Sequence, residues 1–347
     1  MADLSNFNPN DVGVDNGNFF GLPYTPFTAK VVFISVPWDV TTSYKPGTAK
    51  GPQAILQAST QLDVFDFDVP NAWQIGHGTI PMDMEIMKKS IAFRKKAQDI
   101  IEHLEEGGSP EDEEVAKKQK KINKASAELN EYVYHTTSEW LDKGKLVGLI
   151  GGEHSVPLGY MKALGERHNE FGILQIDAHA DLRKAYEGFT FSHASIMYNA
   201  LNLASVKKLV QVGIRDICQD EVDLATNDDR ITMFDDYQLK YGAFEGKTWA
   251  AQCDEIIANL PDKVYVSFDI DGLTPEHSPN TGTPVAGGLS FHQAVYLVKK
   301  VVESGRTIIG FDLNEVAPDK HSEWDANVGA RMMWKLSNFM WLSNQKH

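Results

Sequence analysis

Three ionisable side chains lie two residues apart in the stretch "LQIDAHADLR": Asp177, His179 and Asp181. They directly follow the apolar run at residues 172–176, which has the composition of a buried strand. Alternate residues of an extended chain point to the same side, so the three side chains can converge where that strand ends. Two carboxylates and an imidazole at such a point are typical ligands of a metal ion.

Two further strand ends carry the same residue types. "VYVSFDIDGL" places Asp269 and Asp271 after an apolar run, and "VGLIGGEHS" leads from another run through two glycines to His154. Open α/β sheets bind their ligands at the carboxyl ends of the strands, so all three stretches are expected to meet at one edge. The six candidate metal ligands are therefore His154, Asp177, His179, Asp181, Asp269 and Asp271.

The charge of this set predicts two divalent ions. Four aspartates in one cleft repel one another unless cations or protons neutralise them, and two divalent ions balance four negative charges. Oxygen and imidazole donors without a thiolate favour Mn²⁺, although other divalent ions suit the same donors. Because paired metal ions activate water, we expect two Mn²⁺ per chain and hydrolytic chemistry. The opposing interpretation, six unrelated polar loop residues, requires three independent coincidences.

The elements that position these residues follow a repeating pattern. Short apolar runs rich in β-branched residues predict strands at residues 31–36, 146–150, 172–176, 209–212, 264–268 and 307–311. Helical patterns lie between them, which is typical of a parallel sheet covered by helices on both faces. We expect a single α/β domain over residues 29–347, preceded by an extended arm at residues 1–28 that is rich in Asn, Asp, Gly and Pro.

A charged segment at about residues 84–143 departs from this pattern. Its helical periodicity and the turn around residues 107–110 predict two antiparallel helices, with Ser109 as the N-cap of the second. A surface hairpin without chemical role, a subunit contact and a lid over the site are the three interpretations that remain open.

Composition limits the class of partner. The chain has 347 residues and a formal net charge of −15, which argues against nucleic acid and anionic membrane surfaces and weakly favours a cationic small molecule. No run of 18 apolar residues occurs, and the two cysteines, Cys218 and Cys253, match no disulfide framework or CxxC metal spacing. We expect both thiols to be core residues of a cytoplasmic protein.

The motifs "GGEHS", "DAHAD" and "SFDID", in this order and spacing, resemble those of the ureohydrolases, the family of arginases and agmatinases. The resemblance begins at "VPWDVTTSYKPGTAKGPQAIL" and extends to about Leu336. It implies a three-layer α/β/α fold around a mainly parallel sheet, with the helical hairpin as an insertion. It places the six candidate ligands on the metal-ligand positions of the family. It also implies a homo-oligomer, either a trimer or a hexamer.

Two catalytic residues are implied by the same resemblance. His193, in "FSHAS", matches the histidine that handles the proton of the leaving amine, and Glu315, in "GFDLNEVAP", matches the carboxylate that holds the guanidinium. Both fit the chemistry, because a carboxylate orients a planar cation by paired hydrogen bonds and an amine leaves only when protonated. Thr283, in "PNTGTPVAGG", resembles the loop beside the guanidinium, where it either binds substrate or packs under the metals.

The substrate is predicted from two departures. Arg183 and Cys218 occupy positions from which arginases reach the α-carboxylate and α-amine, whereas "DAHADLRKAYEGFTFSHAS" resembles agmatinases. Agmatine, cleaved to putrescine and urea, is therefore the expected substrate. Arg183 can itself pair with an α-carboxylate, so it is a candidate substrate-binding residue and arginase remains an alternative. Other guanidino-acid or guanidine hydrolases, an inactive metal-binding regulatory homologue and a single-metal deacetylase are further alternatives.

Overall fold

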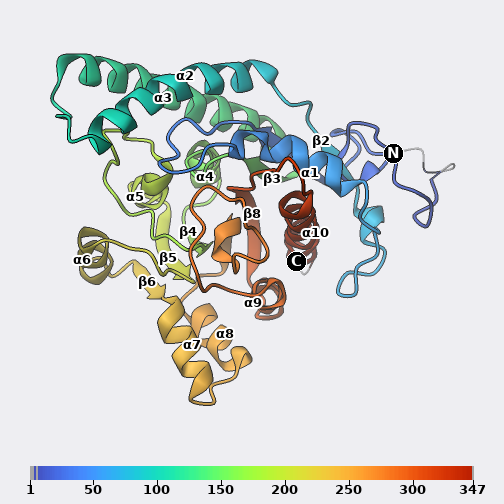
Figure 1. Ribbon diagram of the computed structural model, residues 1–347. Coiled ribbons are helices and arrows are strands. Elements are labelled where there is room, and N and C mark those ends of the chain that lie inside the picture. Colours follow the sequence, from blue (N-terminus) through green and yellow to red (C-terminus); the bar gives the residue numbers. More distant parts are fainter. Residues whose placement is uncertain (1–3, 5–6, 346–347) are drawn as a thin grey trace.

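The computed structural model describes Leu4 and residues 7–345, which fold around one parallel sheet (Figure 1). Its strand order is β2-β1-β3-β8-β7-β4-β5-β6, with every pair parallel. The strands are β1 (Val31–Val36), β2 (His77–Thr79), β3 (Leu146–Gly151), β4 (Phe171–Ile176), β5 (Val206–Val212), β6 (Ile231–Phe234), β7 (Lys263–Asp269) and β8 (Thr307–Asn314).

Helices cover both faces of this sheet. They are α1 (Gly51–Ser59), α2 (Met84–Glu105), α3 (Glu113–Asp142), α4 (Leu158–Gly165), α5 (Ile196–Leu201), α6 (Gln219–Asn227), α7 (Asp236–Phe244), α8 (Trp249–Ala258), α9 (Phe291–Glu303) and α10 (Trp324–Ser343). Apolar residues of α1, α8, α9 and α10 belong to one hydrophobic core, and those of α2, α3, α4 and α5 belong to a second. None of the helices within the described residues is long and apolar enough to cross a membrane.

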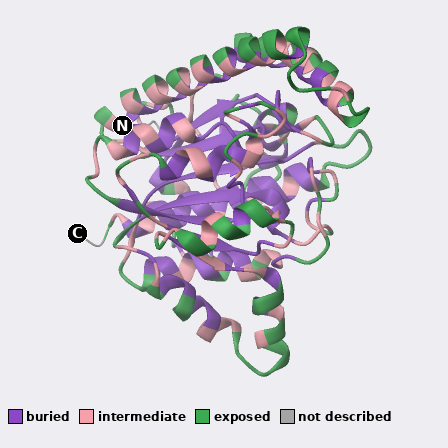
Figure 2. Ribbon diagram, turned by 90° about the vertical axis from the view of Figure 1, so that its left-hand side faces the viewer, coloured by how far each residue is buried: buried purple, intermediate pink, exposed green. Residues whose placement is uncertain are grey.

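The strand residues divide between the two cores by alternation. Val31 and Phe33 of β1 pack into the first core, whereas Val32 and Ile34 pack into the second. Because both faces are covered, whole strands are buried, as the purple centre of Figure 2 shows. The expected three-layer α/β/α architecture is confirmed, and the sheet is parallel throughout.

All six predicted strands are present, but two edge strands were not predicted. β2 and β6 have three and four residues, too short for a period to be recognised. The predicted hairpin is present as α2 and α3, although its second helix does not begin next to Ser109. The Ser109 hydroxyl accepts from the Glu111 amide at 3.1 Å within a turn, and α3 starts at Glu113.

Two details concern the termini and the cysteines. Phe19, Phe20 and Leu22, within the predicted arm, are buried against the core. Residues 1–3 and 5–6 lie outside the described residues, and the division into an arm and a single domain stays a prediction. Of the two cysteines, which are both free, Cys253 is buried but Cys218 is half-buried at the start of α6, so the expectation that both are core residues is wrong for Cys218.

The four central strands position the candidate site. β3, β8, β7 and β4 are neighbours in this order, and because they are parallel their carboxyl ends lie at one edge. The candidate residues lie at these four strand ends: Asp269 is the last residue of β7, and His154, Asp177, Asp271 and Glu315 come shortly after their strands. The topology therefore brings together residues from distant parts of the sequence.

Candidate functional site

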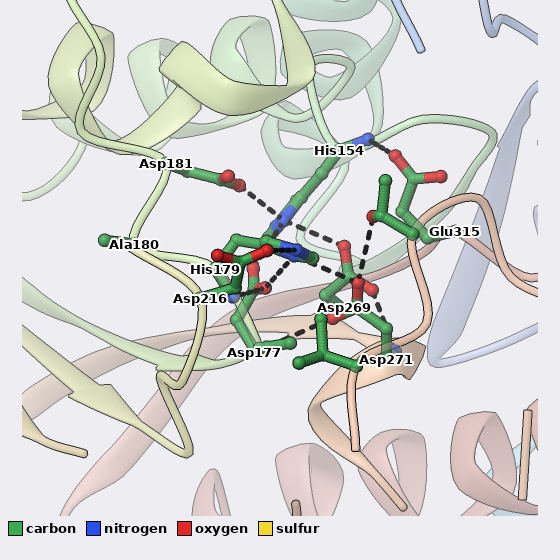
Figure 3. Close-up of polar contacts among 12 residues, drawn as sticks. His154, Asp177, His179, Ala180, Asp181, Asp216, Asp269, Asp271 and Glu315 are labelled. Carbon is green, nitrogen blue, oxygen red and sulfur yellow. Dashed lines mark hydrogen bonds and ion pairs between the residues drawn. The ribbon is translucent and has the colours of Figure 1, made fainter. Parts of the chain in front are cut away.

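The predicted metal ligands meet at this edge of the sheet (Figure 3). The candidate ligands form two groups. Within each group the ligand atoms lie within 4.8 Å of one another. The first group is His154, Asp177 and Asp181, and the second is Asp177, His179 and Asp271. Asp177 belongs to both groups, so one carboxylate lies between two potential ion positions. This is the arrangement expected of a binuclear site.

His154 lies at the centre of the first group. Its Nε2 is 2.8 Å from the Ser267 hydroxyl, which itself donates to Asp312 at 3.1 Å. Ser267 therefore accepts from the Nε2–H group, and Nδ1 is the nitrogen that faces the aspartates. The distances from Nδ1 to carboxylate Oδ2 atoms are 3.0 Å for Asp177, 3.1 Å for Asp181 and 3.3 Å for Asp269.

His179 has the same relation to the second group. Its Nδ1 lies 3.1 Å from Oδ2 of Asp271 and 3.6 Å from Oδ1 of Asp177. On the other side of the ring, Nε2 is 3.9 Å from Asp216, whose side chain is largely exposed. His179 thus closes the cluster towards solvent, whereas His154 closes it towards the core.

Burial and mutual repulsion shift the pKa values of the residues in this cluster. Burial and the neighbouring charge of Asp177 raise the pKa of Asp181 to about 7, and burial with the charge of Asp271 raises the pKa of Asp269 well above its ordinary range. For His154, burial acts to lower the pKa, but the surrounding aspartates outweigh it and raise that pKa. Without cations the cluster therefore retains protons. Hard oxygen donors that need positive charge fit divalent cations.

Glu315 lies directly beside the ligand groups. Its Oε1 accepts from the His154 amide at 2.8 Å, whereas Oε2 is buried and has no hydrogen-bond partner among the described residues. Burial and the nearby Glu153 carboxylate raise the pKa of Glu315 well above its ordinary value. A Cβ at Gly282 would lie 3.3 Å from Oε2, so the absence of a side chain there leaves space beside the free oxygen.

His193 lies between β4 and α5 in the chain, directly before α5. Its amide donates to the Thr41 hydroxyl at 3.1 Å, and its Nε2 lies 3.5 Å from the Ser43 hydroxyl. Burial, reinforced by the positive charges of His179 and Arg94, lowers the pKa of His193 to about 3. The imidazole is therefore neutral at physiological pH.

The two predicted substrate-binding residues have other partners. The Thr283 hydroxyl lies 3.4 Å from Oδ2 of Asp271. Nε of Arg183 lies 3.8 Å from Oε2 of Glu221, and its guanidinium carbon lies 4.7 Å from the ring centroid of Tyr186. Thr283 thus contacts a candidate metal ligand, whereas Arg183 contacts Glu221 and Tyr186.

Several supporting residues were not predicted. Gln175 donates to Asp177 at 2.8 Å and accepts from Gln211 at 2.6 Å, which fixes the carboxylate shared by both groups. Arg215 donates to the backbone carbonyl of Asp271 at 2.7 Å. Gln175 and Ser267 could have been found, because each lies two residues before an aspartate ligand and so points to the same side of its strand.

Comparison with known proteins agrees with this geometry. A model of the arginase family matches residues 29–338. The chain is 31% identical to the N(1)-aminopropylagmatine ureohydrolase of Thermus thermophilus, over 88% of this chain and 90% of that protein. It is 29% identical to the agmatinase of Bacillus subtilis, over 89% and 91% of the two chains.

Solved structures agree on the fold. The agmatine ureohydrolase of Thermoplasma volcanium superposes with a TM-score of 0.70 and 20% identity, covering 99% of this chain and 98% of that one. The family match spans all six candidate ligands, His193 and Glu315. The protein is therefore a member of the arginase family.

Proposed function

We propose that this protein is a hydrolase that uses two Mn²⁺ ions to cleave agmatine into putrescine and urea. The observation that carries the proposal is the Glu315 carboxylate, whose Oε2 is buried and unpaired beside two groups of metal-ligand residues. An unpaired buried carboxylate calls for a cationic partner, and a guanidinium is the cation whose planar donors match it.

The ligand groups supply the site for the ions. His154 and Asp181 would hold one ion, His179 and Asp271 the other, with Asp177 shared and Asp269 beside the first. Bound ions of this kind supply a water activated for attack on the guanidinium carbon. The oxygen-rich donor set favours Mn²⁺.

Glu315 orients the substrate in this scheme. Its Oε1 is held by the His154 amide, so the carboxylate plane is fixed before the substrate binds. Oε2 and the space beside Gly282 can then receive an N–H group of the guanidinium. Fixing the planar group in this way restricts the reacting carbon to one orientation, which lowers the entropic part of the barrier.

His193 handles the proton that the amine needs in order to leave. Because its resting imidazole is neutral, it first takes up a proton released in the reaction and then transfers it to the departing nitrogen. His193 can thus act first as a base and then as an acid, because the attacking water releases a proton and the leaving nitrogen takes one up.

The environment of Arg183 favours agmatine over arginine. Arginine adds an α-carboxylate, and Arg183 would have to leave Glu221 and the face of Tyr186 to bind it. Agmatine has no such group and requires no rearrangement. The formal net charge of −15 also favours a dicationic substrate over the less positive arginine.

A second candidate substrate is N(1)-aminopropylagmatine. The relative from Thermus thermophilus is named for this compound, and it is 31% identical to this chain, compared with 29% for the agmatinase relative. This substrate carries the same guanidinium with a longer polyamine chain. The roles of Glu315 and His193 are the same for both substrates.

Urea release from a panel of compounds tests the proposal. Purified protein reconstituted with Mn²⁺ is assayed with agmatine, N(1)-aminopropylagmatine, arginine, guanidinobutyrate, guanidine and formiminoglutamate. We expect agmatine to give a higher kcat/KM than arginine. A preference for arginine that Arg183→Met abolishes would establish arginase activity in its place, and no turnover of any compound would support an inactive regulatory homologue.

We also propose a cytoplasmic location and a homo-oligomeric state. The location is supported by two free cysteines, which suit a reducing compartment. The trimer or hexamer rests on the family resemblance. Light scattering coupled to size-exclusion chromatography tests it, and a monomeric mass would contradict it.

A further inference from the structure

Helices α2 and α3 contact both loops beside the candidate site (Figure 1). One loop, residues 37–47, follows β1, and the other, residues 182–192, leads to His193. We propose that this helical hairpin positions His193 through the two loops, with Arg94 on α2 and Asn123 on α3 as the positioning residues. The inference rests on the proposed role of His193.

Arg94 binds the loop after β1. Its Nη1 donates to the backbone carbonyl of Val40 at 3.3 Å and also to that of Thr42. Its Nη2 donates to Gln98 at 2.7 Å, one turn further along α2, which fixes the plane of the guanidinium. Hydrogen bonds from a charged donor are stronger than neutral ones, so Arg94 binds the two loop carbonyls strongly.

Ser90 holds the same loop one turn before Arg94. Its side chain is fully buried, and its hydroxyl accepts from the Asp39 amide at 3.0 Å. The Asp39 carboxylate in turn accepts from the Gly47 amide at 2.8 Å and so closes the loop. Helix α2 therefore fixes the start and the middle of residues 37–47.

The loop after β1 contacts His193 directly. Thr41, which lies between the two carbonyls bound by Arg94, accepts from the His193 amide at 3.1 Å through its hydroxyl. The Thr41 amide donates to Glu153 at 2.7 Å, next to the candidate ligand His154. Arg94 is thus connected to the backbone of His193 through Thr41 and its two neighbours in the chain.

Helix α3 holds the second loop. Asn123 uses both ends of its amide on this loop, since Oδ1 accepts from the Thr190 amide at 2.9 Å and Nδ2 donates to the Gly188 carbonyl at 3.0 Å. Gln119, one turn earlier, donates to the Glu187 carbonyl at 3.0 Å. Glu187 has a φ of 53°, a strained conformation that such contacts hold in place.

Contacts with a purely structural role should affect different quantities from contacts that position His193. Contacts that only stabilise the fold would lower the melting temperature without changing the kcat of the folded protein. Contacts that position His193 should lower kcat more than they change KM, because His193 acts after the substrate is bound. The two roles are therefore separable.

The experiment compares Arg94→Gln with the wild type. We expect kcat for agmatine to fall about 10- to 100-fold, the range caused by small misplacements, with a smaller change in KM and unchanged Mn²⁺ content. Hydrogen exchange should increase in peptides covering residues 38–47 and 189–194. Arg94→Lys, which keeps the charge, should recover part of kcat. Asn123→Ala should increase hydrogen exchange in the peptide covering residues 189–194, because it removes the contacts of α3 with that loop.

Coupling to His193 gives the sharpest test. In the His193→Asn background, Arg94→Gln should change kcat by less than about twofold, because the group it positions is already absent. Thr41→Val, which removes the connecting hydroxyl at nearly constant volume, should resemble Arg94→Gln and serves if that variant does not fold.

Arg306→Gln is the matched control. Arg306 also binds a backbone carbonyl, that of Leu260 at 2.9 Å, and the Ser304 hydroxyl at 3.0 Å, but it lies between α9 and β8, outside the hairpin and both loops. Its loss should leave kcat and the exchange of both loops unchanged. Two results with an active wild type would overturn the inference and leave the proposed function intact. One is full kcat in Arg94→Gln. The other is a double variant, Arg94→Gln with His193→Asn, in which the two reductions in kcat multiply. An inactive wild type would instead reject the proposed function, while hydrogen exchange would still report on the loops.

Discussion

Glu315 has a left-handed backbone, with a φ of 62°, immediately after β8. A residue with a side chain is strained there by roughly 1–2 kcal/mol. Hydrogen bonds on both sides hold it, since its amide donates to the Gly152 carbonyl at 2.8 Å and its carbonyl accepts from Thr281 at 2.8 Å. The chain thereby turns away from the strand while the carboxylate stays beside His154.

The space beside Glu315 predicts an effect of Gly282→Ala. The added methyl group would lie 3.3 Å from Oε2 of Glu315 and 3.1 Å from Thr42, tighter than ordinary contact. We expect KM for the guanidino substrate to rise with less change in kcat, because the methyl group occupies the space for the substrate. Steady-state kinetics measure this, and Gly242→Ala in α7, where the nearest atom is 3.5 Å away, is the control. An unchanged KM would show that the substrate does not use this space.

The two proposed catalytic residues should affect different constants. Glu315→Gln removes the charge that faces the guanidinium, so we expect a raised KM and a lowered kcat/KM. His193→Asn should lower kcat by about 10²- to 10⁴-fold with a smaller effect on substrate binding, because proton transfer follows binding. Kinetics of both variants on agmatine test the contrast. Full kcat in His193→Asn would remove His193 from the mechanism.

At the scale of elements, strands with continuous apolar runs could be predicted, since six such runs correspond to β1, β3, β4, β5, β7 and β8. Five of the six candidate ligands could be found because their period-two spacing at a strand end is visible locally. The contacts of Gly282 with Glu315, and of Arg94 with Thr42, could not. They join residues far apart in the chain through packing that no local pattern encodes.

β2 contains a histidine with a consequence for stability. His77 is fully buried, and its ring stacks on that of Phe33 with the two centroids 5.7 Å apart. Neither of its ring nitrogens has a hydrogen-bond partner within the described part of the chain. Burial lowers its pKa to about 3, from 6.5. The folded state therefore requires the neutral ring, whereas the unfolded chain binds a proton below about pH 6.5.

This difference predicts the sign of a pH effect. The stability associated with neutral His77 is fully present above pH 6.5 and is lost as pH falls towards 3, by up to about 1.4 kcal/mol per pH unit. His77→Phe, which keeps the ring stack, should flatten the fall in the free energy of unfolding over this window. Urea denaturation of both proteins at several pH values measures it. Parallel curves would mean that His77 does not contribute to acid sensitivity.

At the scale of the whole molecule, the shared carboxylate predicts how metal content responds to substitution. Asp177 belongs to both ligand groups and Asp181 to one. We expect wild-type protein to retain about two equivalents of Mn²⁺. Asp181→Asn should retain fewer than the wild type, and Asp177→Asn the fewest, because it weakens both positions. Elemental analysis after gel filtration measures this, and saturation of the wild type at one equivalent would contradict a binuclear site.

The position of β8 has a consequence for how the protein is made. It is the last strand of the chain, yet it lies between β3 and β7 in the sheet. Before β8 has emerged from the ribosome, β2-β1-β3 and β7-β4-β5-β6 have no direct strand pairing with each other. We infer that the nascent chain has no continuous sheet, and is inactive, until β8 emerges. Ribosome-stalled chains ending before and after this segment should differ sharply in protease resistance, and equal resistance would contradict the inference.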